Sequence, residues 1–432
     1  MSLRRNALLT VALTALLAIV GEWSGIPGAG RFWCLPAGLL LLALAYDGLM
    51  ARRAGLRLSI VTAPRWRLAR PVEVVLRFAQ TGRRSIELEV APDSPPGVEL
   101  GREVATCTVP PGSAAELRFT AVARRLGRRV WPAMQTRVAG PLRFAWWQRS
   151  LGDAQAITVE PDLLGEANAV RGGDRVGERT SQRRGSGGEI LQLRPYVSGD
   201  ALRSIDWKAT ARAGRLVARD FAEDQHLEIV VGIDVGRSSS IFSGGLDRLG
   251  HYVNLTARLA ERATALDDRV GLVVYGDRPL VALPPGRGMA AVRRIRAVLG
   301  SLEAQTTDSN PMHAATRIRS LVRRRCLVIL LTEIDDAATG SQLLAAVRLL
   351  CPMHLPLIVG LKSAAVESFA LAPTRDWLGP YRSLAAEESR QRQARSIGAL
   401  ATFGVASLVA RPEELEAKVF EAYARFRRER RV

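Results

Sequence analysis

Two apolar runs dominate the first fifty residues and restrict what the chain can fold into. They cover Ala7–Val20, extendable to Trp23, and Phe32–Met50, with a short turn at 24–31 between them. A helix needs about 20 apolar residues to cross a bilayer, and each run approaches that length. A signal peptide would explain the first run but not a second one so soon after it. A buried hairpin in a soluble protein is the other alternative. We favour a transmembrane helical hairpin over residues 1–54.

Charges around the hairpin predict its orientation. Its outer ends carry Arg4, Arg5, Arg52 and Arg53, whereas the turn region carries only Arg31 and Glu22. Basic residues stay preferentially on the cytoplasmic side of a membrane. We therefore expect a protein of the cytoplasmic membrane with both termini, and the bulk of the chain, facing the cytoplasm.

Residues 55–164 have the pattern of a β-sandwich-like domain. Short stretches alternate between apolar and polar residues, and turn sequences such as Ser94-Pro-Pro-Gly97 separate them. The expected strands are Leu56–Val61, Val72–Phe78, Ile86–Val90, Leu117–Val122 and Ile157–Glu160. Nothing in this region has a catalytic pattern.

The pattern changes beyond residue 164. Residues 165–188 are rich in Gly, Arg and Ser and predict a linker, which together with a charged motif occupies 165–225. From 226 to 432, apolar strands alternate with amphipathic helices that begin near Leu246 and Met289, the pattern of a doubly wound α/β domain. Its expected strands are Leu227–Asp234, Val270–Tyr275, Cys326–Thr332, Leu355–Gly360 and Val405–Val409.

Oxygen-bearing side chains follow two of these strands. Asp234 ends the first, Thr332 and Glu333 end the third, and the polar turn Gln305–Ser309 lies between them in the sequence. Ligands of α/β sheets bind at the carboxyl ends of strands, and hard oxygen donors suit Mg²⁺. A polar strand end that only caps the next helix is the alternative interpretation.

The stretch from Asp234 to Ser240 resembles the metal-ion-dependent adhesion site of von Willebrand factor A-like (vWA) domains, whose first motif is Asp-x-Ser-x-Ser. The resemblance implies Asp234 and Ser238 as ligands, Thr306 or Thr307 as the loop threonine, and Glu333 where the family usually has aspartate. Gly236 replaces the first serine, so the site is degenerate, and Mg²⁺ and a metal-free site both remain open.

A second stretch resembles the hallmark of the bacterial DUF58 family, a domain of unknown function. It runs from Gly188 to Asp200, continues through Arg203–Arg212 and ends with Leu216–Phe221. The family typically has a membrane hairpin, a β-rich segment, this motif and a vWA-like domain. The order of segments here is similar over nearly the whole chain.

The charged motif permits three interpretations. It can be an ion-pair network that fixes the linker, a partner-binding surface, or, with Asp200 and Asp206 as acid and base, a catalytic pair. The third lacks a nucleophile, and we expect no enzymatic activity. The candidate partner-binding residues are Tyr196, Gly199, Asp200, Arg203, Asp206, Trp207, Lys208 and Arg212.

The basic charge of the chain does not by itself indicate nucleic acid. The net charge is +19, but only three basic residues are lysines, and the arginine clusters are not interleaved with aromatic residues. Attraction to anionic lipid is the favoured interpretation. The four cysteines are scattered without a metal or disulfide pattern, and we expect them buried and reduced.

The resemblance implies a membrane-anchored adaptor that binds other proteins. Proteins similar to this family are associated with MoxR-type AAA+ ATPases in the maturation of complexes or maintenance of the envelope. A metal-independent scaffold at the membrane is the alternative. A metal-dependent hydrolase would need a base and a closed pocket that the sequence does not indicate.

Overall fold

The computed structural model describes residues 2–23, 31, 33–101, 104–162, 184–222, 226–334, 337–371 and 377–429. The chain divides into two compact units. The first combines residues 1–162 with 245–250 and 299–303, and the second combines 163–244, 251–298 and 304–432.

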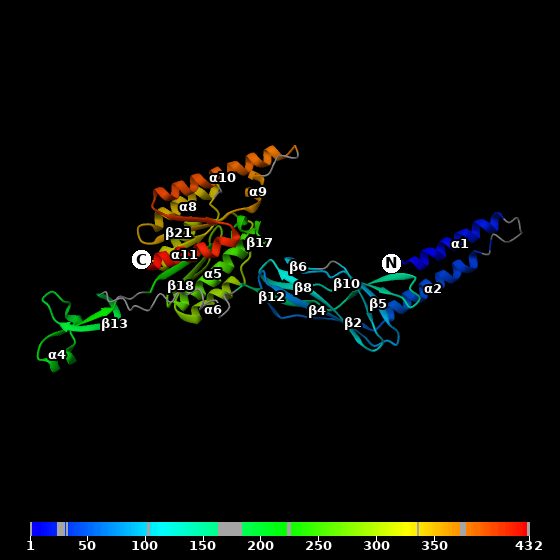
Figure 1. Cartoon of the computed structure of the whole chain (residues 1–432), viewed down its shortest axis with the longest axis horizontal. Coiled ribbons are helices and arrows are strands. Elements are labelled where there is room, and N and C mark those ends of the chain that lie inside the picture. Colours follow the sequence, from blue (N-terminus) through cyan, green and yellow to red (C-terminus); the bar gives the residue numbers. More distant parts are fainter. Residues whose placement is uncertain are drawn as a thin grey trace. The chain divides into compact units, whose positions relative to one another are not determined.

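Two N-terminal helices, α1 (Arg5–Trp23) and α2 (Cys34–Arg53), lie side by side (Figure 1). Both are long and apolar enough to cross a membrane. Their leucines are mostly exposed; Leu16 and Leu42, for example, are 57% and 69% exposed. The two expected apolar helices are thus present, and their apolar surface is not covered by the protein.

The carboxyl end of α2 is joined tightly to the β-rich region. Asp47 is fully buried, and its carboxylate accepts N–H hydrogen bonds from Leu142 (2.8 Å) and Phe144 (3.0 Å). Gly140 permits this approach, because a Cβ there would lie 2.3 Å from the Asp47 Cγ. A buried carboxylate without these donors would be costly, so the pairing fixes the helix on the loop.

Two arginines reinforce the same junction. Arg149 donates from Nη1 to the carbonyls of Ala51 (3.0 Å) and Ala54 (2.9 Å) at the end of the helix. Arg4 donates to both carboxylate oxygens of Glu87 (2.9 and 3.0 Å) and stacks over Trp146. That hydrogen bond from Arg4 lowers the pKa of the Glu87 carboxyl.

Three sheets form the β-rich region. One has the order β1-β11-β10-β5-β7, a second β2-β4-β8-β6 and a third β3-β12-β9. All pairs are antiparallel except β3 with β12. The strands are β1 (Ser2–Leu3), β2 (Leu56–Val61), β3 (Arg65–Arg67), β4 (Pro71–Gln80), β5 (Ile86–Val90), β6 (Val98–Leu100), β7 (Ala105–Val109), β8 (Ala114–Ala123), β9 (Gly127–Trp131), β10 (Met134–Ala139), β11 (Ala145–Leu151) and β12 (Gln155–Glu160).

Alternation along these strands builds the core of the β-rich region. In β4, Leu76 and Phe78 are fully buried, while Arg77 and Ala79 are exposed. Trp66 and Trp131 meet edge to face, with ring centroids 5.9 Å apart. All five strands expected from alternation are present.

A six-stranded mixed sheet forms the centre of the second unit, in the order β19-β18-β15-β20-β21-β22. β19 is antiparallel to its neighbour, and the other pairs are parallel. The strands are β15 (Glu228–Asp234), β18 (Arg269–Tyr275), β19 (Pro279–Gly286), β20 (Leu327–Leu331), β21 (Leu355–Leu361) and β22 (Ala406–Ala410). The five strands expected from the apolar runs are confirmed, and β19 is an addition.

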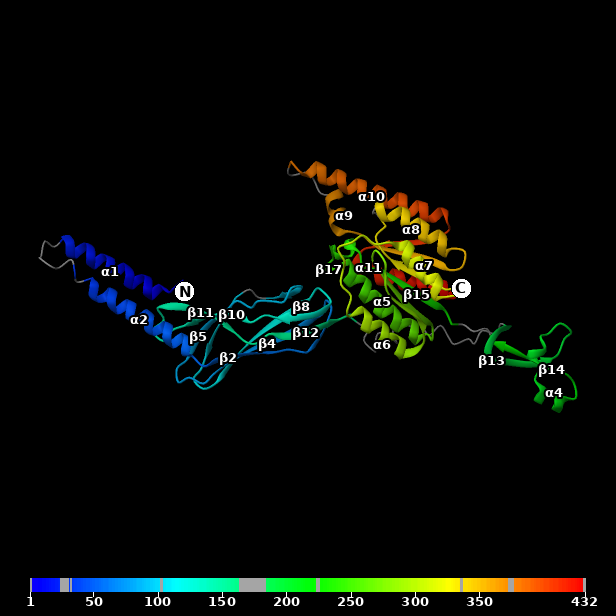
Figure 2. The same ribbon diagram turned by 180° about the vertical axis from the view of Figure 1, so that it is seen from behind.

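Helices alternate with these strands. They are α5 (Arg248–Ala265), α6 (Gly288–Leu299), α7 (Pro311–Leu321), α8 (Ala337–Leu350), α9 (Ala364–Leu371), α10 (Gly379–Thr402) and α11 (Pro412–Glu429). Apolar side chains of α7, α8 and α10 share one buried cluster with those of the sheet, and α10 lies beside α8 in both views (Figures 1 and 2). Short elements β16 (Phe242–Ser243), β17 (Leu246–Asp247) and η3 (Arg237–Ser240) follow β15.

The last helix is bonded to the sheet through a buried carboxylate. Tyr423 of α11 donates from its hydroxyl to the buried carboxylate of Asp268, just before β18, and Asp268 also accepts the Leu227 N–H (2.8 Å). Burial raises the pKa of Asp268 against these hydrogen bonds, which favour its ionised form. The pair ties the last helix to the sheet.

The charged motif forms a small structure of its own. Strands β13 (Arg184–Pro195) and β14 (Val217–Ala222) pair antiparallel, and the 3-10 helix η2 (Leu202–Ser204) and helix α4 (Trp207–Ala213) connect them. We call residues 192–220 the motif module. The linker predicted at 165–188 lies largely outside the described residues, but its last residues belong to β13.

The cysteine prediction needs correction. All four are free, but only Cys326 is buried, while Cys107 and Cys351 are half-buried and Cys34 is exposed at the start of α2. Cys34 lies on the exposed apolar surface of the helical hairpin. An apolar neighbourhood in the sequence is typical both of such a surface and of a protein core, so it did not predict the exposure of Cys34.

Candidate functional site

The predicted metal site lies where β15 and β20 end side by side. These strands are parallel neighbours, so Asp234 and Thr332 come together at the same edge of the sheet. The loop before α7 crosses this edge, because the Gln305 N–H bonds to the Val235 carbonyl (2.6 Å) and the Arg237 N–H to the Thr307 carbonyl (2.9 Å). Three segments distant in the sequence therefore converge on Asp234.

Asp234 is the centre of the hydrogen bonding at this edge. Its Oδ2 accepts from the hydroxyls of Ser309 and Thr332, both at 2.7 Å, and its Oδ1 accepts from the Gly236 N–H at 2.8 Å. The side chain is 1% exposed. The hydroxyl of Ser239 donates to the Asp234 carbonyl (2.7 Å) and fixes the turn that follows.

Gly236 has a geometric reason to lack a side chain. A Cβ at this position would lie 2.9 Å from the Ser309 nitrogen and 3.0 Å from the Ser309 Cβ. The loop that carries Ser309 thus occupies the space in which the first serine of a vWA motif would stand. The glycine that departs from the family pattern is therefore the residue that allows this loop to approach closely.

Other predicted ligands lie around this centre rather than on it. Ser238 is half-buried in η3, Glu333 is half-buried just after β20, and Thr306 and Thr307 are exposed in the loop. The sequence placed Thr332 at this edge, but the loop residue chosen was Thr306 or Thr307, whereas Ser309 is the one bonded to Asp234. Thr332 directly follows an apolar strand, which was a usable signal, whereas the choice among the hydroxyls of 306–309 depends on the path of the loop.

The donor types at this edge suit Mg²⁺, but their arrangement does not fit it. The oxygens of Asp234 already accept three hydrogen bonds in a closed environment, and a cation would have to displace them. Among the described residues, no group of three carboxylate, histidine or cysteine side chains could hold a metal ion. Asp234 instead acts as an acceptor that holds three segments together.

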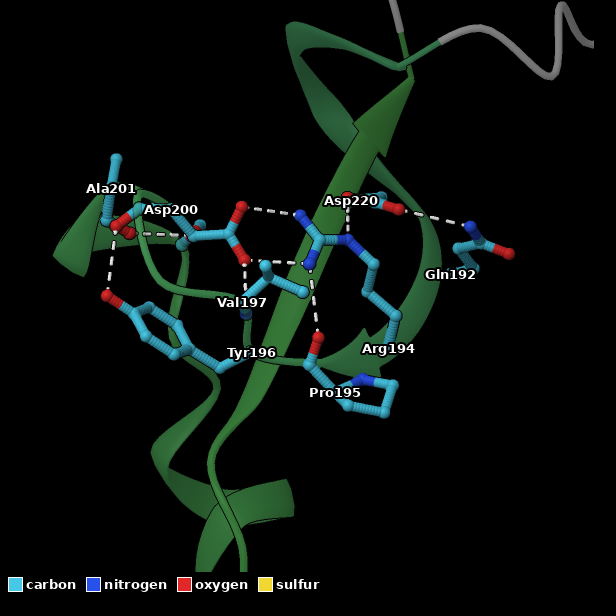
Figure 3. A network of polar contacts seen from close by, with 9 residues as sticks. Gln192, Arg194, Pro195, Tyr196, Val197, Asp200, Ala201 and Asp220 are labelled. Carbon is cyan, nitrogen blue, oxygen red and sulfur yellow. Dashed lines mark hydrogen bonds and ion pairs between the residues drawn. The ribbon is translucent and has the colours of Figure 1, made fainter.

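The motif module is organised by Arg194. Its guanidinium makes two hydrogen bonds to the carboxylate of Asp200 (2.7 and 2.6 Å) and a third from Nε to Asp220 (3.1 Å), as Figure 3 shows. Gln192 also donates to Asp220 (3.0 Å). The hydrogen bond to Asp200, more than that to Asp220, raises the pKa of Arg194. A paired fork of this kind fixes orientation as well as distance.

The same network fixes the turn that follows β13. Asp200 accepts the Val197 N–H (2.9 Å), and its carbonyl accepts the Tyr196 hydroxyl (3.3 Å) (Figure 3). Gly199 lies within this turn with φ of 107°, a conformation that favours glycine. Tyr196, Gly199 and Asp200 are therefore structural parts of the turn.

Asp206 holds the second half of the motif module. It caps α4 by accepting the N–H groups of Lys208 (3.0 Å) and Ala209 (2.9 Å), and it accepts from Arg219 of β14 (2.9 Å). These bonds, that from Arg219 foremost, lower the pKa of Asp206 to about 2. Both oxygens of Asp206, like those of Asp200, therefore accept hydrogen bonds within the motif module.

The remaining motif residues point to the solvent. Trp207 is 67% exposed, and Arg203, Lys208 and Arg212 are exposed as well. Sequence reasoning therefore selected residues of two kinds, those that build the motif module and those on its surface. It missed Arg194 and Asp220, which complete the network and whose pairing depends on the antiparallel register of β13 and β14.

Comparisons with known proteins give a limited picture. No curated protein matches the chain. Among solved structures, the conserved hypothetical protein BatB from Bacteroides thetaiotaomicron is 13% identical, with a TM-score of 0.28 over 45% of this chain and 98% of that one. Alpha-2-macroglobulin from Escherichia coli is 18% identical, with a TM-score of 0.22 over 26% of this chain and 17% of that one. Structural similarity at these TM-scores does not identify the fold or the function of this chain.

The match to a protein family is more informative, because it covers the motif module and much of the α/β sheet. It begins in β13 and ends just before β21. The resemblance expected from the sequence is confirmed over these residues: the model of the family described as "Protein of unknown function DUF58" matches residues 192–354.

Proposed function

We propose that this protein is a membrane-anchored adaptor that binds other proteins through the motif module. The proposal rests on a set of exposed apolar side chains on a small structure that is held together by charged hydrogen bonds. Trp207, Leu202 and Val197 are 67%, 74% and 61% exposed, and Leu193 and Leu216 are exposed by 52% and 45%. Exposed apolar groups gathered on a small structure mark interaction surfaces.

The motif module has little core to explain its order. Its buried apolar side chains are Ile205, Val217 and Ala218, fewer than the exposed ones named above. A two-stranded hairpin alone is marginally stable in water. The ion pairs of Arg194 and Arg219 supply the order that a core normally gives. The ion pairs order the motif module while Trp207 stays exposed, and an exposed tryptophan on an ordered structure is well suited to binding a partner.

Charge indicates the chemistry of the partner surface. Lys208 and Arg212 are exposed on α4 beside Trp207, four residues apart and hence on the same side of the helix. Such a face fits an apolar groove with an acidic rim. By resemblance, the proposed partner is a MoxR-type AAA+ ATPase, with a role in protein-complex maturation or envelope maintenance.

The α/β domain at residues 226–432, called the α/β unit from here on, is proposed to be vWA-like and to act without a metal. The strand order β18-β15-β20-β21-β22, with a reversal at β15, supports this fold. The closed environment of Asp234 favours a docking surface independent of Mg²⁺ over metal-dependent recognition or hydrolysis.

The helical hairpin is proposed to anchor the protein in the cytoplasmic membrane, with the β-rich region and everything after it in the cytoplasm. The exposed leucines of α1 and α2 support insertion, and the arginines at their outer ends support the orientation. Alkaline carbonate extraction tests insertion. Reporter fusions at either terminus test orientation, and periplasmic activity at either end contradicts it.

The adaptor proposal is tested by affinity for a purified MoxR-type ATPase of the same organism. The full chain in mild detergent is titrated as wild type, Trp207→Ala and Trp377→Ala. Trp377 is a matched control, because it is 78% exposed but lies outside the motif module. We expect about a 30-fold loss for Trp207→Ala only, the usual effect of removing a central interface tryptophan. Equal affinities, or no binding by wild type, contradict the proposal.

A further inference from the structure

We propose that arginines around the base of the helical hairpin form a docking surface for anionic phospholipid headgroups. We call these the basal arginines: Arg5, Arg52, Arg53, Arg83, Arg84 and Arg143. The inference rests on the membrane anchoring proposed above and goes beyond it, because it assigns a lipid class and a set of residues to the base of the anchor.

The junction described above leaves the β-rich region no freedom to move away from the membrane. Asp47 holds the loop of Leu142, Arg149 holds the end of α2, and Arg4 holds Glu87. Gly48 adds close packing, because a Cβ there would lie 2.7 Å from the Trp147 ring. Insertion of the helices therefore fixes the height of the loops around them.

Two loops of the β-rich region extend beside α2, from its carboxyl end toward its middle. Arg84, between β4 and β5, donates from Nη1 to the Tyr46 hydroxyl (3.4 Å). The turn Gly140–Arg143 bonds to Asp47, the next residue of α2. Both contacts lie nearly two helical turns before the last residue of the helix, Arg53.

The length of helix left free by these loops brings them to the lipid surface. From Cys34 to Tyr46, α2 has roughly 13 residues, or about 20 Å at 1.5 Å per residue, whereas the hydrocarbon layer is about 30 Å thick. This part of α2 is too short to hold the loops clear of the bilayer. The loops that carry Arg84 and Arg143 must then lie in the headgroup layer.

The charges around the base of the helical hairpin are complementary to phosphate. The six basal arginines are exposed, and the carboxylates beside them are already engaged. Glu87 is paired with Arg4 and lies 3.6 Å from Arg143, and Asp47 is bonded to backbone amides. Within the described part of the chain, no carboxylate pairs with Arg5, Arg52, Arg53 or Arg83. The surface thus keeps a net positive charge.

Apolar and aromatic groups accompany these arginines. Leu142 and Leu3 are 46% and 40% exposed, and Tyr46 is 39% exposed. Leucine beside arginine, with a tyrosine at the same level, is the composition of a surface that enters the headgroup layer. A surface that bound soluble phosphate would not need the apolar groups.

The experiment reconstitutes the full chain in nanodiscs of phosphatidylcholine alone or mixed equally with phosphatidylglycerol. Native mass spectrometry then counts the lipids retained on the protein. The test variant carries Arg→Gln at residues 52, 53, 83 and 84. The control carries Arg→Gln at 65, 67, 118 and 128, exposed residues of β3, β8 and β9 with the same loss of charge.

We expect wild type and control to retain phosphatidylglycerol over phosphatidylcholine by roughly tenfold, and the test variant to lose most of this preference. Salt should weaken the preference of wild type. Equal retention of the two lipids by an inserted wild type, or equal losses in both variants, overturns the inference but leaves the anchor intact. Failure of wild type to insert into either nanodisc overturns the anchor as well.

Discussion

The protein uses buried or half-buried aspartates in two opposite ways. At the end of β15, Asp234 is closed off from solvent and bonded to neutral donors from three segments of a well-packed sheet. In the motif module, Asp200 and Asp206 are bonded to arginines where hardly any core exists. The first network fixes loops on a fold that other forces already hold together. The second takes the place of a core and leaves apolar side chains outside.

This contrast separates structural and recognition roles. The sheet edge resembles a site but is internally satisfied, whereas the motif module presents Trp207, Leu202 and exposed basic residues to solvent. Whether a residue binds a ligand or holds the fold together is therefore indicated better by its hydrogen bonds than by its similarity to a ligand residue of the family. The following predictions test the two halves of the comparison.

The largest effect is expected from Asp234→Ala. The change leaves two hydroxyls and one N–H buried without their acceptor, which should cost about 3 kcal/mol of the unfolding free energy of the α/β unit. Urea titration of the full chain in detergent, followed by hydrogen exchange in β15 and β20, measures it. Asp308→Ala, on the same loop but exposed, should stay within about 0.5 kcal/mol. If the two changes lowered the free energy of unfolding equally, Asp234 would not have the structural role assigned to it.

Gly236→Ser restores the serine of the family motif and should not restore a metal site. Its Cβ has no room beside Ser309, so we expect a loss of about 2 kcal/mol from overpacking. Calorimetry with Mg²⁺ should show no binding to wild type or to this variant. Binding of one Mg²⁺ by either protein, abolished by Asp234→Ala, would show that the sheet edge is a working metal site.

Arg194→Ala should loosen the motif module without disturbing the sheet. We expect amide exchange in β13 and β14 to accelerate roughly tenfold, with exchange in β15 unchanged, because the motif module and the sheet have separate sources of order. Arg194→Lys should rescue little, since an ammonium cannot reproduce the fork to Asp200 together with the bond to Asp220. Full rescue by lysine would mean that charge alone, rather than geometry, orders the motif module.

A smaller effect is expected when low pH protonates Asp206. The folded pKa of Asp206 is about 2, below its ordinary value near 3.8, so its stabilising effect is complete above that ordinary value. It is lost as the pH falls through about 2. Protection factors of the α4 amides, which are corrected for the pH dependence of intrinsic exchange, should fall over this window in wild type. In Asp206→Asn they should be low and independent of pH there. A transition in α4 above pH 5 would point to another group.

Sequence patterns predicted the elements better than the contacts between them. Continuous apolar runs located the five parallel strands, because strands covered on both faces admit few polar residues. β19 escaped prediction because Pro279, Pro284 and Pro285 interrupt its pattern. Ser309 was missed because any of four neighbouring residues could have faced Asp234 until the path of the loop was known.

The network of Arg194 was missed for a related reason. Its partners Asp200 and Asp220 lie 6 and 26 residues away; the turn after β13 brings Asp200 to it, and the hairpin register brings Asp220. The buried position of Asp47 was equally hidden, since a charge near the end of an apolar run indicates a helix end rather than a tertiary anchor. Pairings across distant segments depend on the fold and are not contained in local patterns.

The most direct test of the account is photocrosslinking from residue 207 in cells. A benzoylphenylalanine replaces Trp207 in the full chain, with the same replacement of Trp377 as the matched control, and mass spectrometry identifies the adducts. The account predicts one discrete adduct with another protein, a MoxR-type ATPase, from residue 207 and none from residue 377. Adducts from residue 207 confined to the chain's own α/β unit would show that the apolar surface of the motif module packs internally, and would contradict the account.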